Sequence, residues 1–408
     1  GSLYKNILLS QTGSMYILNK KNIKNFKYHT WAPYKKIKNS NLKLKIKLKT
    51  INDNVINKLI VSSDNRCIVI PLSAGYDSRF ILSGLIQKGY KNIVTFSYGA
   101  SKNREAKVAK SISNYLRVPW FYIKYDNNNQ KIVMKSKLYE DYKKFSDTTS
   151  SVHFPQDFQA IYQLKKEKKI PHDSIIANGQ TGDFISGNHI LKSSENNFDN
   201  VLNLYYLKHY KIWNSLVKKN KKLMISLLKG RIASLKLKKI ENNLLLELLQ
   251  RFEYEDRQAK YVMGGQRIYE FLGFDWRLPL WDLEYINFWE NTEVKYKINQ
   301  SLYKEVLLEQ NWANVWRGFP INPKNSYSLN IFLIRFLFKC LFSILGKDKW
   351  HKFELRFLDY FMAPLCGYAP WKYKKIIADN RGYSGPLSWH IEEYLNKKNI
   401  NWNGECFK

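Results

Sequence analysis

Residues 67–79 read Cys-Ile-Val-Ile-Pro-Leu-Ser-Ala-Gly-Tyr-Asp-Ser-Arg and carry the clearest structural signal in the chain. An apolar run typical of a buried strand leads into a small, polar turn, and a helical apolar pattern follows. The backbone N–H groups of such a turn and the N-terminus of the next helix can bind one anionic group. Gly75 permits close backbone approach, Ser73 and Ser78 can donate hydroxyl groups, and Asp77 is placed to bind Mg²⁺. The stretch therefore predicts a phosphate site.

Three further apolar runs have the spacing of βαβ units. Residues 93–99 and 120–125 predict strands with a helix between them, and residues 174–177 predict another strand. Strands and helices that alternate in this way form a parallel sheet, whose ligands bind at the carboxyl ends of the strands. We therefore expect an α/β fold, a twisted parallel sheet flanked by helices, with the polar strand ends at Ser73 and Ser97 on one edge.

Four segments of the chain resemble a known family in sequence and in order. The loop at residues 73–78 resembles the Ser-Gly-Gly-x-Asp-Ser loop of the ATP pyrophosphatases, with Ala74 in place of one glycine. The turn at 178–183 is similar to the glycine-rich turn of the asparagine synthetases, and residues 276–282 and 303–308 resemble two later motifs of that family. The resemblance implies an ATP pyrophosphatase domain with the adenine nucleotide alpha hydrolase-like fold.

The resemblance also implies ATP and Mg²⁺ as ligands. Asp77 and Asp183 are the implied Mg²⁺ ligands, and Lys304 is the implied catalytic lysine. Either Arg317 or Lys324 is expected to provide a second cation, because a forming adenylate and a departing pyrophosphate both need compensating charge. The implied ATP-binding residues are Leu72, Ser73, Ala74, Gly75, Tyr76, Asp77, Ser78, Phe96, Ser97, Asn178 and Gly179.

One position departs from the family pattern. The chain has Gln180 where the family usually has an acidic residue, and an amide cannot act as a general base. The remaining candidates for proton removal are Asp282 and a water held by Gln180 and Asp183. Asp282 can equally be a capping or salt-bridged carboxylate beside Arg277.

The expected activity follows from the resemblance. Residues 258–262, 267–276 and 278–282 look like asparagine synthetase-related proteins of bacterial surface polysaccharide synthesis. These proteins imply an amide-forming ligase that adenylates a uronic acid of a capsule or O-antigen precursor, nucleotide-linked or lipid-linked, and releases AMP and pyrophosphate. Two alternatives remain: an asparagine synthetase or peptide amide ligase, and a non-catalytic nucleotide- or membrane-binding scaffold.

The domain prediction has three parts. Residues 1–60 form a basic segment expected to be β-rich, residues 61–325 form the ATP pyrophosphatase domain, and residues 326–408 form a helical, aromatic and basic region. About 60 residues before the first strand are too few for a glutaminase domain of typical size. We therefore expect nitrogen from ammonia or an amine, or from a separate glutaminase.

Composition bears on location and partners. The 408 residues have a net charge of +33, no acidic residue before Asp53 and none between 201 and 240. Such basic segments favour an anionic membrane surface, and a lysine-rich proteome is the alternative explanation. The four cysteines form no CxxC pair, and no signal peptide is visible, so we expect a cytoplasmic protein, peripheral on the inner membrane face. Nucleic acid is not favoured, because no RNA-binding module is visible.

The apolar run at residues 331–345 is shorter than the ~20 residues that span a bilayer. Arg335 and Lys339 share one face of it at i, i+4 spacing. An interfacial helix and a helix packed on the catalytic domain both fit this pattern.

Overall fold

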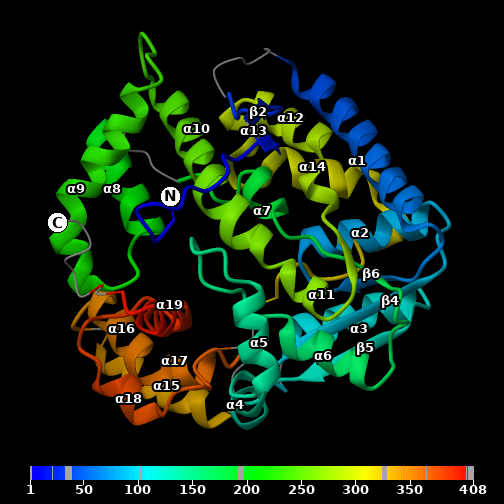
Figure 1. Ribbon diagram of the computed structural model, residues 1–408. Helices are drawn as coiled ribbons and strands as arrows, with labels where there is room; N and C mark the ends of the chain where they lie inside the picture. The colour runs from blue at the N-terminus through cyan, green and yellow to red at the C-terminus, as the bar shows by residue number, and fades with distance from the viewer. Residues whose placement is uncertain are drawn as a thin grey trace.

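The protein has an α/β fold built on one parallel sheet, which confirms the predicted architecture (Figure 1). The computed structural model describes residues 2–20, 22–32, 39–101, 103–191, 197–323, 329–342, 344–363, 365–400 and 402. The strand order is β5-β4-β3-β6-β7, and every neighbouring pair is parallel. The strands are β3 (Ile68–Pro71), β4 (Ile93–Gly99), β5 (Trp120–Lys124), β6 (Ile175–Ala177) and β7 (Asp275–Arg277).

The central strand β3 is buried on both faces because its side chains alternate between two cores. Ile68 and Ile70 belong to one hydrophobic cluster, and Cys67 and Val69 belong to the other. The helices that contribute to the first cluster are α1 (Asn41–Ser63), α2 (Tyr76–Gln87), α3 (Arg104–Tyr115), α12 (Leu283–Asn291) and α14 (Ser301–Gln310). Those of the second cluster are α4 (Asn127–Met134), α5 (Lys137–Phe145), α6 (Phe158–Lys166) and α11 (Arg267–Phe271).

The N-terminal segment differs from the β-rich prediction for residues 1–60. Among the described residues of this segment, β-structure is confined to the hairpin of β1 (Ser14–Leu18) and β2 (Ile23–Lys27), and residues 41–63 form the long helix α1. The sequence from Leu42 to Lys49 alternates apolar and basic residues, a period-two pattern typical of a strand. The helix buries Leu44 and Leu48 but leaves Leu42 and Ile46 exposed, so the i, i+4 pair determines the structure. The expected boundary at residue 60 falls inside α1, which packs on α2, α12 and α14.

Two helical parts lie to the left of the sheet in the view of Figure 1, one above the other. The first is a cluster formed around α8 (Phe198–His209), α9 (Asn214–Ala233) and α10 (Asn242–Glu253), followed by the π-helix η1 (Tyr254–Val262). The second consists of the described C-terminal residues: α15 (Leu329–Phe342), α16 (Lys347–Phe353), η5 (Glu354–Leu358), α17 (Asp359–Met362), α18 (Tyr373–Ala378) and α19 (Pro386–Lys397). The remaining short helices are α7 (Gly182–Ile185), η2 (Pro279–Trp281), α13 (Val294–Lys297), η3 (Ile298–Gln300) and η4 (Trp312–Asn314).

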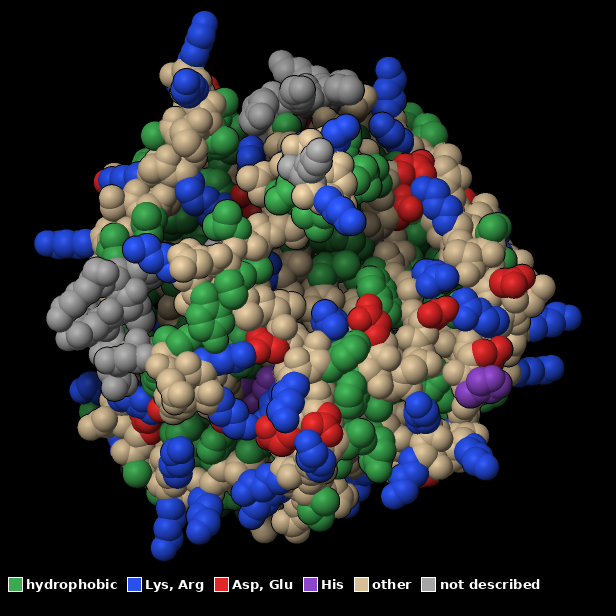
Figure 2. Space-filling model, in the orientation of Figure 1, with side chains coloured by type: hydrophobic (Ala, Val, Ile, Leu, Met, Phe, Trp, Pro, Cys, Tyr) green, Lys and Arg blue, Asp and Glu red, His purple; other side chains and the backbone are tan. Residues whose placement is uncertain are grey.

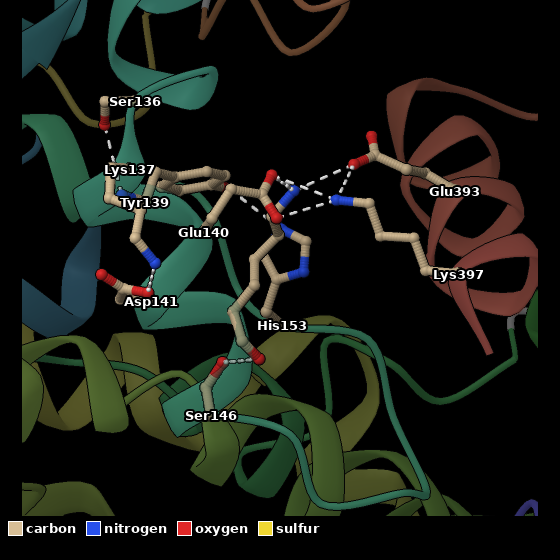
Figure 3. A network of polar contacts seen from close by, with 10 residues as sticks. Ser136, Lys137, Tyr139, Glu140, Asp141, Ser146, His153, Glu393 and Lys397 are labelled. Atoms are coloured by element: carbon tan, nitrogen blue, oxygen red, sulfur yellow. Dashed lines mark hydrogen bonds and ion pairs between the residues drawn. The ribbon is translucent and has the colours of Figure 1, made fainter.

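Helix α19 packs on α5 through a network in which two lysines and two glutamates contact one another (Figure 3). Lys143 lies 2.5 Å from Glu140 and 2.9 Å from Glu393, and Lys397 lies 2.8 Å from Glu140 and 3.1 Å from Glu393. Beside the network, His153 Nε2 lies 2.9 Å from the hydroxyl of Tyr139 on α5. Because each cation contacts two carboxylates, the network fixes the position of α19 better than separate surface pairs would.

Charge is spread widely over the face shown in Figure 2, where Lys and Arg side chains project around the whole outline. Among the helices in the described ranges, none has the length and apolar composition needed to cross a membrane.

Candidate functional site

The carboxyl ends of β3 and β6 lie side by side where the strand order reverses. The chain runs from β3 outward to β4 and β5, and the other half of the sheet, β6 and β7, lies on the opposite side of β3. In open parallel sheets, ligands bind in the crevice at such a reversal. The loop after β3 and the turn after β6 are the two segments that the sequence singled out, so the fold brings both predicted loops to one place.

Hydrogen bonds to its own serine hydroxyl groups stabilise the conformation of the loop after β3. The Oγ atom of Ser78 accepts a hydrogen bond from the N–H of Ser73 at 3.0 Å, and the Oγ of Ser73 accepts one from the N–H of Gly75 at 3.1 Å. The Oγ of Ser97 donates to the carbonyl of Leu72 at 2.7 Å, which ties the loop to β4. The loop leads directly into α2, whose first turn presents its N-terminus there.

The turn after β6 packs directly against Asp77. A Cβ atom on Gly179 would lie 2.6 Å from the Cβ of Asp77, and one on Gly182 would lie 2.5 Å from its Cγ. Thr181, between them, has a left-handed backbone with φ of +78°. Only residues without a side chain allow the second loop to approach the first so closely.

Asp77 and Asp183 form the acidic part of the site. The Tyr303 hydroxyl donates to Oδ1 of Asp77 at 2.9 Å, and the exposed Asp183 contacts the amides of Asn188 and Gln300, each at 3.4 Å. Burial, and then the charge of Asp183, raise the pKa of Asp77 to about 8. The nearby negative charge of Asp183 disfavours ionisation of Asp77, and a divalent cation would remove that cost.

The donor set suits Mg²⁺ bound together with phosphates. Within the described ranges, no group of three or more His, Cys, Asp or Glu residues is arranged to hold a metal alone. Mg²⁺ is commonly bound by one or two carboxylates plus substrate phosphate oxygens and water. Asp77 and Asp183 beside a phosphate-type loop match that arrangement.

The predicted basic residues that the structure describes differ in burial and in their position relative to the loop after β3. Lys304 is half-buried, with Nζ 5.4 Å from the ring centre of Tyr76 at the loop, and Arg317 is exposed on the segment after η4. Lys324 lies outside the described residues. Arg79 is fully buried, and its guanidinium donates to the carbonyls of Ala74, Val315, Phe319 and Pro320 at 2.6 to 3.2 Å.

Gln180 is held in a network of amides. Its Oε1 accepts from Nε2 of Gln266 at 2.6 Å, while Nδ2 of Asn178 donates to Oε1 of Gln266 at 2.9 Å and to the Tyr269 hydroxyl at 3.0 Å. The side chain of Asn178 is thus occupied in structure, which leaves only its backbone for a ligand. Phe96 is fully buried in the core below.

Asp282 lies away from the two loops. It caps the N-terminus of α12 by accepting from the N–H of Glu284 at 2.9 Å, and it pairs with Lys58 at 2.9 Å. It lines a separate cavity with Arg277 and Pro279, on the side of the sheet where α1 packs. The structure therefore places Asp282 in a capping and salt-bridged position.

A cavity of about 640 Å³ opens from the two loops toward the C-terminal helices. Its wall near the loops includes Asp77, Gly179, Gln180, Thr181 and Asp183. The opposite wall comes from the helical parts, including Arg257, Tyr261, Asp359, Gly367 and His390. Three segments far apart in sequence thus enclose one space.

Two buried polar atoms in this cavity wall have no partner within the described residues. They are Oγ1 of Thr181 and Nε2 of His390, on side chains that are 6% and 3% exposed. Burial lowers the pKa of His390 to about 4, so the ring is neutral, and its other nitrogen bonds the backbone of Gly367. Nε2 is therefore an acceptor, and a donor from water or from a ligand in the cavity would satisfy it.

A histidine–carboxylate pair borders the cavity where it meets the α8–α10 cluster. His189 lines the cavity, and its Nδ1 lies 2.6 Å from Oε1 of the buried Glu253. Burial alone raises the pKa of Glu253, but the hydrogen bond and charge of His189, with the charge of His209, outweigh burial and lower it to about 2. Glu253 is therefore ionised at neutral pH and accepts a hydrogen bond from Nδ1 of His189.

Sequence reasoning assigned no role to several of these residues. Arg79 had a visible signal, since it is a charge directly before the apolar run at residues 80–82 of α2. Tyr303 lay inside a quoted motif, but only its neighbour Lys304 was singled out. His390, Gln266 and Glu253 had no local signal, because each meets the site through contacts distant in sequence.

In comparisons with known proteins, no family model matches the chain, and no curated protein is similar enough to count as a relative.

Proposed function

We propose that the protein is an ATP-dependent, AMP-forming amide ligase of the asparagine synthetase type, with an ATP pyrophosphatase domain. The proposal rests mainly on one observation. Asp77 and Asp183 lie together beside a loop that resembles a phosphate-binding loop, at the mouth of a cavity large enough for a second substrate. Such a site can bring the phosphates of MgATP and a carboxylate together. Positioning of this kind and charge compensation supply most of the rate enhancement in phosphoryl-group chemistry.

The first step is attack of the acceptor carboxylate oxygen on the α-phosphorus of ATP. The bond to the β-phosphate breaks, and pyrophosphate leaves with the electron pair. The N–H groups at the start of α2 and the hydroxyls of Ser73 and Ser78 hold the phosphates, and Lys304 adds positive charge near the loop. Asp77 and Asp183 would hold Mg²⁺, which neutralises the phosphate oxygens.

The second step is attack of ammonia or an amine on the activated acyl carbon, with loss of AMP. The nitrogen must lose a proton, and Gln180 cannot accept it. His189 lines the cavity and its Nδ1 contacts Glu253, so the neutral ring would accept the proton at Nε2 and the ionised Glu253 would stabilise the imidazolium that forms. We assign proton removal to His189 on that arrangement, and not to Asp282, which lies outside the cavity.

The acceptor that fits best is a sugar carboxylate. Nε2 of His390 needs a donor and Oγ1 of Thr181 needs a partner, and hydroxyl groups provide both. Amides of Gln130, Gln156 and Gln258 also line the cavity, with apolar surface from Met134, Phe154 and Tyr261 between them. Amides beside apolar rings are suited to a ring that is polar at its edge and apolar on its face.

The test is pyrophosphate release from MgATP with ammonium present, across sugar nucleotides that carry a uronic acid and across aspartate. Release with one uronate, and none with the matching neutral sugar, is the expected result. Release with aspartate alone would replace the sugar acceptor by an amino acid. ATP binding without release for any acceptor, including lipid-linked uronates, would contradict the ligase and favour a scaffold.

The substitution His189→Gln is expected to separate the two steps. Pyrophosphate release in the first turnover should persist, whereas amide formation should fall about 100-fold, because general base catalysis contributes about that much. The matched control is His209→Gln, since His209 lies 3.5 Å from the other oxygen of Glu253 but does not line the cavity. Quench-flow measurement of AMP, pyrophosphate and amide checks this, and equal loss in both steps would remove His189 from the second.

A further inference from the structure

Helix α15 has one face packed on the protein. Its Phe338 and Phe342 rings lie 4.8 Å from the ring of Phe353, and Phe342 also contacts Trp350 of α16 at 5.9 Å. On the same side, Arg335 pairs with Glu354 of η5. These contacts fix which side of the helix faces inward.

The other face of α15 is apolar and exposed. The side chains of Leu337, Leu341 and Ile344 are 62%, 66% and 91% exposed, and they follow one another at helical spacing. Phe332, Leu333, Ile334, Phe336 and Leu345 are exposed as well, and Phe338 is still 38% exposed although its ring contacts Phe353. Scattered exposed apolar residues are common, but a continuous group of this size marks an interaction surface.

The exposed charges around this face are mostly positive. The sequence from Leu329 to Lys347 contains no Asp or Glu, and Lys339 is exposed on the helix itself. Lys347, Lys349 and Lys352 follow on α16, also exposed, with Asp348 as the single acid among them. A second copy of this surface would bring like charges together, whereas a layer of negative headgroups over hydrocarbon complements both the lysines and the apolar side chains.

We propose that α15, with Ile344, Leu345 and the exposed lysines of α16, is an interfacial docking surface for a bilayer that contains anionic lipid. At 14 residues the helix is about 21 Å long, shorter than the ~30 Å hydrocarbon core, so it lies along the membrane surface and does not cross it. The apolar face enters the boundary between headgroups and acyl chains, and the lysines remain at the headgroups.

This surface belongs to the same helical part as one wall of the large cavity. Asp359, Ala363 and Leu365 line the cavity, and they follow α16 and η5 directly in the chain. Docking through α15 would therefore hold the cavity close to the membrane. The proposal does not depend on the reaction, because it rests only on the exposed face and its charges.

The experiment is flotation of the full chain with phosphatidylcholine vesicles, with or without 30% phosphatidylglycerol. Binding is expected with the anionic vesicles, to weaken in high salt, and to be at least tenfold weaker with phosphatidylcholine alone. The double variant Leu337→Glu, Leu341→Glu should reduce binding at least tenfold. Both side chains are exposed, so the unfolding midpoint and circular dichroism should not change.

The matched control is Leu223→Glu, Leu227→Glu, which places the same charges on exposed positions of the basic helix α9. This control should bind vesicles as the unchanged protein does. Loss of binding in the α9 variant alone would assign docking to α9 and overturn the proposal. Absence of vesicle binding, together with a dimer in sedimentation equilibrium that the α15 variant dissociates, would make a second copy the occupant instead.

Discussion

Substitution of Asp77 by asparagine is expected to lower pyrophosphate release about 1,000-fold or more, while the protein stays folded. Asparagine keeps an oxygen that can accept the Tyr303 hydroxyl, and it fits the space left by Gly179 and Gly182. It removes the negative charge that Mg²⁺ needs, and loss of one charge-stabilising group at a transition state costs several kcal/mol. Asp275→Asn is the control, because Asp275 pairs with Arg66 at the far edge strand and does not line the cavity. Equal loss in both variants would contradict the role of Asp77.

The raised pKa of Asp77 adds a pH signature to this experiment. The pKa is about 8 in the folded protein and near 4 in an unfolded chain, so the unfolded state loses its proton first as pH rises. Stability that the neutral Asp77 contributes is thus present at pH 4 and is lost progressively up to pH 8. The unfolding midpoint of the Asp77→Asn variant should rise relative to that of the unchanged protein between pH 5 and pH 8. Added Mg²⁺ should raise the midpoint of the unchanged protein more at pH 8.5 than at pH 6, and should not raise that of the variant.

Substitution of Arg79 by methionine is expected to cost about 3 kcal/mol of stability, in the range found when buried hydrogen-bond networks are broken. Four backbone carbonyls lose their donor: one in the loop after β3 and three in residues 315–320. Methionine fills a similar volume, so the loss measures the hydrogen bonds and not a cavity. Burial lowers the pKa of Arg79 to about 10, so the guanidinium stays charged at neutral pH.

The control for Arg79 is Arg66→Met, which removes an exposed pair with Asp275 and should change stability by less than about 0.5 kcal/mol. Arg79→Lys should restore little, because a single ammonium cannot reach four carbonyls as a planar guanidinium does. Urea unfolding measures the stabilities, and ATP titration should show weaker binding in Arg79→Met, since residues 315–320 no longer support the loop. Unchanged urea midpoints would show that the four bonds contribute nothing net.

The local sequence was sufficient to predict the central strand, the turn after it and the start of the next helix. The run from Cys67 to Arg79 combines a strand, a turn and a helix start within 13 residues, so its structure follows from its own pattern. Short strand β7 was not expected, because three residues carry no periodicity. The structure of residues 41–63 was predicted wrongly, because their apolar residues fit both the two-residue period of a strand and the four-residue spacing of a helix. Only the packing of α1 against α14 decides in favour of the helix.

The candidate site divides in the same way. The loop residues were predictable because spacing alone places Ser73, Asp77 and Asp183 at strand ends. The C-terminal part of the cavity wall was not predictable, since His390 reaches it only through the docking of α19 on α5, more than 240 residues earlier in the chain. Tertiary packing also places Asp282 away from the two loops, and the sequence motif around it does not reveal this.

The charge network between α5 and α19 has a consequence for the timing of biosynthesis. Both loops have been synthesised once residue 183 is made, but Tyr303 and residues 315–320, which support the first loop, follow later, and one wall of the cavity arrives last, with Pro386–Lys397. A nascent chain thus assembles the site in the order of loops, loop support and cavity wall. On the proposed function, a bound nucleotide would face open water until α19 leaves the ribosome, and coupling to a second substrate would begin only when synthesis is nearly finished.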